Sequence, residues 1–171
     1  MRYLTALAGA VTLAMTALVL QVANLPGAAP EAIHATPVTP RQLAYEAATA
    51  VAAKVLVSNG CTAQYASLAG QAAVDAGIQP QVVAGVIVVE SSCNPLAISP
   101  AGAVGLMQIN PRVWRHSRTE LQDPSANIRI GTKILVDYVR PHGLREGLHR
   151  YNGLGDDGTY GAHVMYAAYR R

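Results

Sequence analysis

Apolar residues in the second half of the chain recur at the spacing of an α-helix. Ile130, Ile134 and Tyr138 follow one another every four residues, which indicates one buried helix face. The dipeptide Asp123-Pro124 precedes them and is a strong helix start, because aspartate accepts hydrogen bonds from the first turn and proline fits the first helical position. We predict a helix from there to about Arg140, where a proline stops it.

Proline, glycine and capping residues divide the rest of the chain into further helices. Gly60 and Gly77 are expected to end two of them in the left-handed conformation, and Thr62 is expected to cap the second. No stretch alternates apolar and polar residues as a strand does, so the predicted fold class is all-α, a compact helical domain with short connections. The expected helices cover residues 41–58, 62–76, 80–90, 104–109, 113–118, 123–140 and 144–151, with a last one from Asp157 or Thr159 to near Tyr169.

Residues 1–25 form a hydrophobic segment that we interpret as a signal peptide or a membrane anchor. The apolar run from Leu4 to Val22 is 19 residues long, whereas a spanning helix needs about 20 residues and a signal-peptide core about 7–15. The length favours an anchor, and the alanine, glycine and threonine content favours a cleaved signal. Both imply export, with the protein periplasmic or anchored to the inner membrane facing the periplasm, and with membrane contact only through this segment.

Three segments follow this hydrophobic stretch. Residues 26–40 contain four prolines and predict an extended, semi-rigid linker. Residues 41–60 form an alanine-rich helix, and the sequence leaves open whether it docks on the domain that follows. Residues 61–171 are expected to form that domain, which is long enough to bury a core.

The overall composition excludes several classes of protein. Apolar residues make up 51% of the chain and charged residues 13%, so this is not a disordered polymer. The net charge of +3 is too small and too scattered to indicate nucleic-acid binding. The five histidines lack the spacing of metal ligands, and no phosphate-binding loop, dinucleotide fingerprint or nucleophile elbow is present. We therefore expect no metal and no cofactor.

Glu90 is the strongest candidate for chemistry. It stands at the end of the apolar run 82–89, where a polar, turn-rich loop begins. Burial beside aliphatic side chains disfavours the carboxylate and raises its pKa. A carboxyl group in that state can keep its proton until a leaving group needs it.

Four short motifs lie in order around this acid: Glu90-Ser91-Ser92-Cys93-Asn94-Pro95, Ser99-Pro100-Ala101-Gly102-Ala103, Gly105-Leu106-Met107-Gln108 and Tyr151-Asn152-Gly153. Together, over roughly residues 61–171, they resemble the catalytic core of the soluble lytic transglycosylases, lysozyme-like enzymes that cut peptidoglycan. The resemblance implies cleavage of the MurNAc–GlcNAc β-1,4 bond with formation of a 1,6-anhydromuramoyl product. In that reaction a single glutamate, here Glu90, acts first as the acid and then as the base.

The resemblance also implies roles for residues around the acid. Tyr151 resembles a tyrosine whose hydroxyl contacts the acid, and Asn152 resembles a residue that meets the N-acetyl group. Ser91 would bind substrate or orient Glu90, although it fits a helix cap equally well. The other candidate substrate-binding residues are Met107 and Gln108, a pair on the cleft floor, and Tyr160, a later cleft tyrosine; core packing is the alternative for Met107 and Tyr160.

One position departs from the family pattern, because Arg150 stands where a small alanine usually precedes the tyrosine. A long cation there would crowd the cleft or bind a substrate carboxylate, and the sequence does not choose between these. Trp114, the sole tryptophan, would stack on a sugar ring or pack half-buried.

Two other functions stay open. A hydrolase of the lysozyme type would pair Glu90 with a second carboxylate, Asp156 or Asp157, although these aspartates also suit a turn and a helix cap. A non-catalytic wall-binding or assembly protein is the other alternative. Peptidoglycan glycan strands are the expected partner, and the modest size suits an enzyme that opens gaps for a secretion, conjugation or phage envelope-crossing machine.

Cys61 and Cys93 are the only cysteines. An even count in an exported protein predicts a disulfide, with two separately buried thiols as the alternative. Such a bond would stabilise the fold by about 3–4 kcal/mol according to the chain-entropy estimate. It would also fix the surroundings of Glu90, which lies three residues before Cys93.

Overall fold

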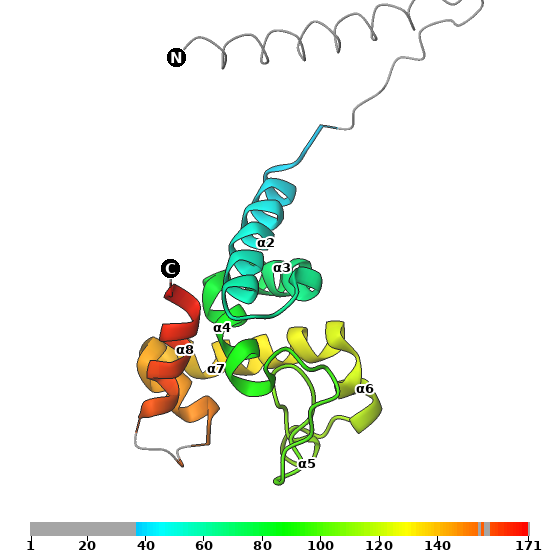
Figure 1. Cartoon of the computed structure of the whole chain (residues 1–171), viewed down its shortest axis with the longest axis vertical. Coiled ribbons are helices and arrows are strands. Elements are labelled where there is room, and N and C mark those ends of the chain that lie inside the picture. The colour runs from blue at the N-terminus through cyan, green and yellow to red at the C-terminus, as the bar shows by residue number, and fades with distance from the viewer. Residues whose placement is uncertain (1–36, 154, 156–157, 171) are drawn as a thin grey trace, which may run out of the picture. The chain divides into compact units, whose positions relative to one another are not determined.

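The computed structural model describes residues 37–153, 155 and 158–170. These residues confirm the predicted all-α class, and the only β pairing among them is two isolated bridges, Ile98–Val104 and Val104–Ile109. The described helices belong to one unit of the chain, Val38–Arg171. In chain order they are α2 (Pro40–Ser58), the 3₁₀ helix η1 (Ala63–Tyr65), α3 (Ala66–Ala76), α4 (Pro80–Ser91), α5 (Pro111–Trp114), α6 (Arg118–Gln122), α7 (Pro124–Tyr151) and α8 (Thr159–Tyr169) (Figure 1).

Helix α4 is the central element, and it packs against α2, α3 and α8. Figure 1 shows it between these helices, in green. Every residue from Val82 to Ile87 is buried, which is typical of a helix that is apolar all round. Gly85 allows α8 to approach closely, because a Cβ atom there would lie 2.8 Å from the carbonyl oxygen of Val164. Glu90 therefore projects from the end of a helix that is buried on all sides.

Helix α2 is docked on the domain, which answers the question that the sequence left open. Its residues Ala48, Ala52 and Leu56 are buried, and it packs mainly against α3. Gly70 of α3 makes this contact possible, because a Cβ atom there would lie 2.6 Å from the backbone nitrogen of Thr49. The close approach of the two backbones depends on small residues on both helices.

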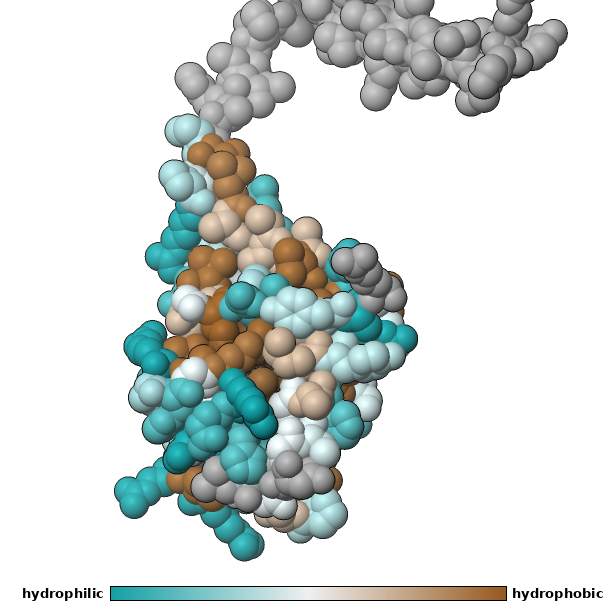
Figure 2. Space-filling view, turned by 90° about the vertical axis from the view of Figure 1, so that its left-hand side faces the viewer, coloured by the Kyte–Doolittle hydropathy of each residue, from teal (hydrophilic) through white to brown (hydrophobic). Residues whose placement is uncertain are grey.

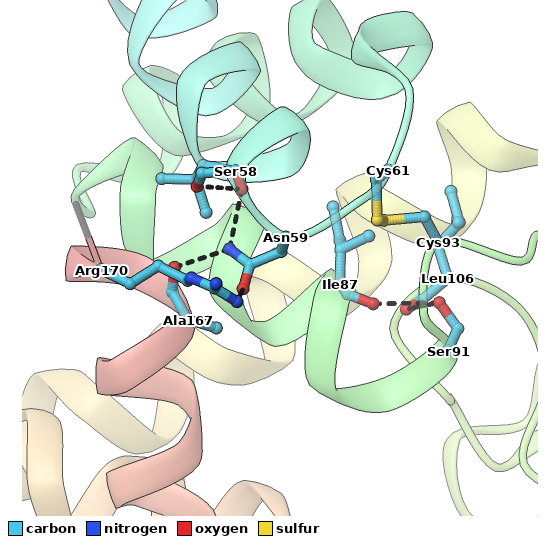
Figure 3. Close-up of a disulfide and its surroundings, with 10 residues drawn as sticks. Ser58, Asn59, Cys61, Ile87, Ser91, Cys93, Leu106, Ala167 and Arg170 are labelled. Carbon is cyan, nitrogen blue, oxygen red and sulfur yellow. Dashed lines mark hydrogen bonds between the residues drawn. A yellow bond between two sulfur atoms is a disulfide. The ribbon is translucent and has the colours of Figure 1, made fainter.

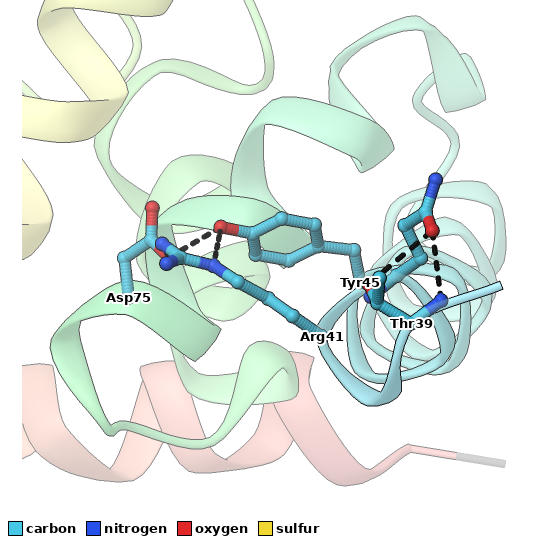
Figure 4. A network of polar contacts seen from close by, with 5 residues as sticks. Thr39, Arg41, Tyr45 and Asp75 are labelled. Carbon is cyan, nitrogen blue, oxygen red and sulfur yellow. Dashed lines mark hydrogen bonds and ion pairs between the residues drawn. The ribbon is translucent and has the colours of Figure 1, made fainter. Parts of the chain in front are cut away.

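Polar contacts strengthen the N-terminal end of α2. Thr39 caps the helix in a capping box with Gln42. Figure 4 shows Arg41 and Tyr45 of α2 meeting Asp75 of α3: the Arg41 Nη2 to Asp75 Oδ1 distance is 2.7 Å, and the Tyr45 hydroxyl donates to the same oxygen at 2.6 Å. These hydrogen bonds lower the pKa of the Asp75 carboxyl. The network is exposed, so its contribution to stability is small.

The outward face of α2 carries larger apolar side chains. Leu43, Val51 and Val57 are among the exposed large hydrophobic residues of the described chain. Figure 2 shows apolar patches between polar side chains in the upper part of the molecule, where α2 lies. Helix α2 thus docks through Ala48, Ala52, Val55 and Leu56 and leaves other large apolar side chains in solvent.

Helix α7 begins as predicted, because the side chain of Asp123 accepts from the backbone N–H of Ala126 at 2.8 Å. Ile130 and Ile134 are buried, and Tyr138 is half-buried. The helix does not end at Arg140, but its backbone leaves helical geometry at Gly143 (φ 78°, ψ 168°). The two predicted helices 123–140 and 144–151 therefore lie in tandem and are joined across this kink.

The prediction was wrong for residues 104–109, which are a tight loop and not a helix. Gly105 and Gln108 have positive φ angles of 80° and 46°, and Val104 and Ile109 exchange backbone hydrogen bonds as a β-bridge. Two smaller corrections follow. Thr62 was expected to cap a helix, but its side chain makes no capping hydrogen bond. Residues 113–118 were expected to form one helix, but two short helices, α5 and α6, lie on either side of Arg115. Gly60 and Gly77 adopt positive φ as predicted.

The predicted leader, residues 1–25, and the linker up to residue 36 lie outside the described residues. The described helices include none with the length and apolar character needed to cross a membrane. The last predicted helix is α8, which starts after Gly158, and Asp157 lies outside the described residues.

Candidate active site

Glu90 occupies the C-terminal end of α4, where its carboxyl group is partly buried. The hydroxyl group of Tyr160, from α8, donates to Glu90 Oε1 at 2.7 Å. Burial raises the pKa of Glu90 from its ordinary 4.5 to about 7, and the hydrogen bond from Tyr160 opposes part of that rise. At neutral pH the carboxyl group is therefore present in both its protonated and its ionised form.

Tyr160, and not Tyr151, contacts the acid. Tyr160 was a candidate for substrate binding or core packing; it is buried, as core packing requires, and its hydroxyl also contacts the acid. Tyr151 was expected to make that contact, but its hydroxyl donates to the backbone oxygen of Met107 at 2.7 Å. The difference arises from packing, because α8 lies against α4 whereas the end of α7 faces the 104–109 loop.

Tyr151 is nevertheless part of the surroundings of Glu90. Burial raises its pKa well above the ordinary value, and the negative charge of Glu90 raises it further. The phenol therefore stays protonated over the whole range in which Glu90 titrates. It serves as a fixed hydrogen-bond donor to the loop.

Ser91 connects the acid's helix to the same loop. Its hydroxyl lies 3.0 Å from the carbonyl oxygen of Ile87, one turn back along α4, and 2.9 Å from that of Leu106 (Figure 3). Both partners are backbone groups of this chain, so the structure supports the helix-end role of Ser91 and a position that orients the end of α4. The hydroxyl is directed at the protein interior and not at an open surface.

The pair Met107 and Gln108 separates into two environments. The Met107 side chain is fully buried and packs on Gly131, where a Cβ atom would lie 2.7 Å from its sulfur. It belongs to the core beneath the site and cannot touch a substrate in this structure. Gln108 is half-buried, and its Nε2 donates to the carbonyl oxygens of Gly105 (2.9 Å) and Ala97 (3.2 Å). These bonds fix the Gln108 amide at the surface of the loop.

The remaining predicted residues make contacts of their own. Asn152 is exposed and ends α7. The Arg150 Nε atom lies 2.8 Å from Glu146 Oε1 in an ion pair along the same helix, although the two are not aligned as a hydrogen bond. Trp114 packs edge-on against Tyr138 at a centroid distance of 6.3 Å and is 36% exposed. Asp156 and Asp157, the candidate second acids, lie outside the described residues.

The predicted disulfide is confirmed. Cys61, in the loop after α2, is bonded to Cys93, in the loop after α4, with their Cα atoms 6.0 Å apart (Figure 3). Ser92 and Cys93 both have positive φ angles, of 48° and 65°, which non-glycine residues adopt at a cost in energy. The disulfide therefore fixes an unfavourable turn three residues after the acid.

One residue near the site was missed by the sequence analysis. Asn127 is fully buried on α7, and its side chain hydrogen-bonds the backbone of the 104–109 loop. The signal available was a polar residue on the same helix face as Gly131 and Ile134, because a buried amide must find partners inside the protein.

The fold and the site together describe a helical protein with a partly buried glutamate at the end of its central helix. The Transglycosylase SLT domain is the family model that matches, over residues 67–160, which is more than half of the chain. The chain therefore belongs to this family.

Curated relatives share part of this region. The endo-type membrane-bound lytic murein transglycosylase A of Citrobacter koseri is 35% identical over 85 residues, which is 43% of this chain and 41% of that protein. The transglycosylase of Enterobacteria phage PRD1 is 35% identical over 95 residues, 54% of this chain and 36% of that protein. The membrane-bound lytic murein transglycosylase C of Actinobacillus pleuropneumoniae is 38% identical over 85 residues, 43% of this chain and 23% of that protein. The chain thus spans less than half the length of these relatives.

A solved structure is also similar, the 70 kDa soluble lytic transglycosylase of Escherichia coli. It is 22% identical, with a TM-score of 0.42, over 78% of this chain and 26% of that chain. A likeness at this level is too low to support an argument.

Proposed function

We propose that this chain is a peptidoglycan lytic transglycosylase that cleaves the MurNAc–GlcNAc β-1,4 bond and leaves a 1,6-anhydromuramoyl end. The observation that carries the proposal is the state of Glu90, a partly buried carboxyl group with a pKa of about 7 and a hydrogen bond from Tyr160. Membership of the SLT family and relatives named as lytic murein transglycosylases support it.

In the first step the protonated Glu90 gives its proton to the glycosidic oxygen, and the bond from that oxygen to C1 of the muramic acid breaks. The carbonyl oxygen of the substrate's own N-acetyl group stabilises the positive charge at C1. In the second step the Glu90 carboxylate removes the proton from the C6 hydroxyl, whose oxygen then bonds to C1. Glu90 ends protonated, as it began, and no water is consumed.

A pKa near 7 suits a group with both roles, because the acid form must be populated before the first step and the base form must accept a proton in the second. Tyr160 assists by donating to Oε1, and we propose that the other oxygen, Oε2, meets the substrate. We propose Gln108 and Asn152 as substrate contacts, because the resemblance implies that role and neither residue is fully buried.

We also propose that the enzyme is exported and acts on glycan strands of the cell wall. The disulfide supports an oxidising compartment. We propose service to a secretion, conjugation or phage machine, and a phage transglycosylase is among the relatives. The activity itself can be tested on isolated sacculi without such a machine.

The test is to digest purified sacculi with the wild-type protein and identify the products by mass spectrometry. Anhydromuramoyl ends support the proposal, and reducing ends would instead support a lysozyme-type hydrolase. Glu90→Gln should abolish all release of product, while Glu46→Gln, a matched change at an exposed glutamate of α2, should leave it unchanged. Cleavage by folded Glu90→Gln would overturn the assignment of the acid.

A further inference from the structure

The peptide group between Leu106 and Met107 is hydrogen-bonded at both of its ends by side chains. Its carbonyl oxygen, on Leu106, lies 2.9 Å from the Ser91 hydroxyl, which donates to it. Its N–H group, on Met107, donates to Asn127 Oδ1 at 2.8 Å. The next carbonyl along the chain, that of Met107, accepts from the Tyr151 hydroxyl at 2.7 Å. Side chains from the end of α4 and from both ends of α7 therefore meet on this peptide group and on the carbonyl that follows it.

Asn127 is the deepest of these three side chains. It is 0% exposed, and besides its bond to Met107 its Nδ2 donates to the carbonyl oxygens of Leu121 at 2.7 Å and Val104 at 2.9 Å. Both amide hydrogens and the amide oxygen thus have backbone partners. Val104 and Met107 both belong to the loop, so one side chain holds the loop at two points.

Gly105 leaves the space that the Asn127 amide occupies. A Cβ atom at Gly105 would lie 2.2 Å from Asn127 Nδ2 and 2.5 Å from the carbonyl oxygen of Leu121, and its φ angle of 80° also disfavours a side chain. A loop with any larger residue at this position could not accommodate the buried amide. The glycine and the asparagine together define how the loop sits on α7.

We propose that Asn127 is a positioning residue for the acid, acting through the Leu106–Met107 peptide group. Two routes lead from that peptide to Glu90. The first runs through Ser91, which is bonded to the peptide's carbonyl and is the next residue after Glu90. The second runs through Tyr151, which is bonded to the following carbonyl and whose phenol faces the Glu90 charge. This inference rests on the proposed function insofar as it concerns turnover.

The consequence of losing the amide follows from these contacts. Without Asn127 the peptide group is free to turn, and the carbonyl groups that Ser91 and Tyr151 require no longer have fixed directions. Water then reaches Glu90, whose pKa falls toward its ordinary value, because burial is what raises it. Tyr160 on α8 donates to Glu90, and Tyr151 on α7 lies close enough for the Glu90 charge to raise its pKa. The raised pKa of Tyr151 keeps that phenol protonated near neutral pH.

The test compares Asn127→Ser with Thr132→Val in the full chain. Thr132 is a matched control, because it is also buried on α7 and reaches only the Met107 sulfur, at 3.7 Å, and not the loop backbone. The titration of Glu90 is followed by carbon NMR of its labelled carboxyl group, and kcat and KM are measured on glycan strands. For Asn127→Ser we expect a lower titration midpoint, a kcat reduced by about tenfold or more, and a KM changed by less than about twofold. Thr132→Val should change neither.

A folded Asn127→Ser protein with the wild-type titration midpoint would overturn the proposal, as would an equal shift in Thr132→Val. If Asn127→Ser does not fold, Ser91→Ala removes the hydrogen bond at the other end of the same peptide group. It should shift the midpoint in the same direction by a smaller amount, and an unchanged midpoint would then reject the proposal. The titration of Glu90 needs no turnover, so it tests this proposal even if the wild type yields no anhydromuramoyl product. The absence of that product would reject the proposed function and not the role of Asn127.

Discussion

Replacing Glu90 by glutamine should separate activity from stability. The substitution keeps the shape of the side chain and an oxygen that can accept from Tyr160, but it removes the carboxyl proton and the charge. The pKa of Glu90 is raised from 4.5 to about 7 by burial. One pKa unit corresponds to about 1.4 kcal/mol, so the ionised form of Glu90 costs the folded state up to about 3 kcal/mol.

The sign of this cost fixes its dependence on pH. The folded protein binds the Glu90 proton more tightly than the unfolded chain, so the contribution is fully favourable below pH 4.5. It declines as the pH rises and is lost above about pH 7, where Glu90 is ionised in both states. Relative to the wild type, Glu90→Gln should therefore gain stability between pH 5 and pH 8, by up to about 3 kcal/mol.

The assay is urea unfolding of both proteins at pH 5 and at pH 8, with Glu46→Gln as the control for removal of an exposed charge. The gap in unfolding free energy between Glu90→Gln and the wild type should widen toward pH 8, while the control should show a gap of less than about 0.5 kcal/mol at both values. Two results would refute a buried Glu90 that retains its proton. The gap in unfolding free energy between Glu90→Gln and the wild type would be the same at both pH values, or it would be smaller at pH 8 than at pH 5.

Three further changes have expected outcomes. Tyr160→Phe removes a hydrogen bond that lowers the pKa of the acid, so the alkaline limb of kcat/KM against pH should move to higher pH; a limb that stays or moves down contradicts the contact. Replacing both Cys61 and Cys93 by serine should reduce the unfolding free energy by about 3 kcal/mol, measured by denaturant titration, and wild-type stability in the double variant would contradict a structural disulfide. Gly105→Ala should reduce the unfolding free energy by about 2 kcal/mol more than Gly60→Ala does. Both glycines have positive φ, but only at Gly105 would an added Cβ atom meet neighbours, the nearest at 2.2 Å; equal losses of unfolding free energy would mean that the loop shifts to make room for the methyl group.

Local signals were sufficient to predict most of the helices. Asp123 and the proline after it start α7 as expected, because a cap of this kind depends only on neighbouring residues. The apolar run before Glu90 gave both the central helix and the direction of the acid's pKa shift, since a helix that is apolar all round must be buried. The docking of α2 could not be decided in this way, because its alanines form only a weak stripe.

Contacts between distant residues could not be predicted from such signals. Residues 104–109 have apolar side chains at helical spacing, but Asn127 and Gly105 make a tight loop more favourable than a helix. Tyr151 and Tyr160 are both tyrosines near the end of the chain, and which hydroxyl reaches Glu90 depends on how α8 lies on α4. Side chains that reach across the fold decide these details.

The most direct test of the account is digestion of sacculi in water labelled with oxygen-18. If Glu90 serves as acid and then as base toward the substrate's own C6 hydroxyl, the muramoyl products carry the 1,6-anhydro ring and contain no oxygen-18. Products with reducing ends that have each gained one labelled oxygen would show that water attacks C1, and would contradict the proposed single-residue mechanism.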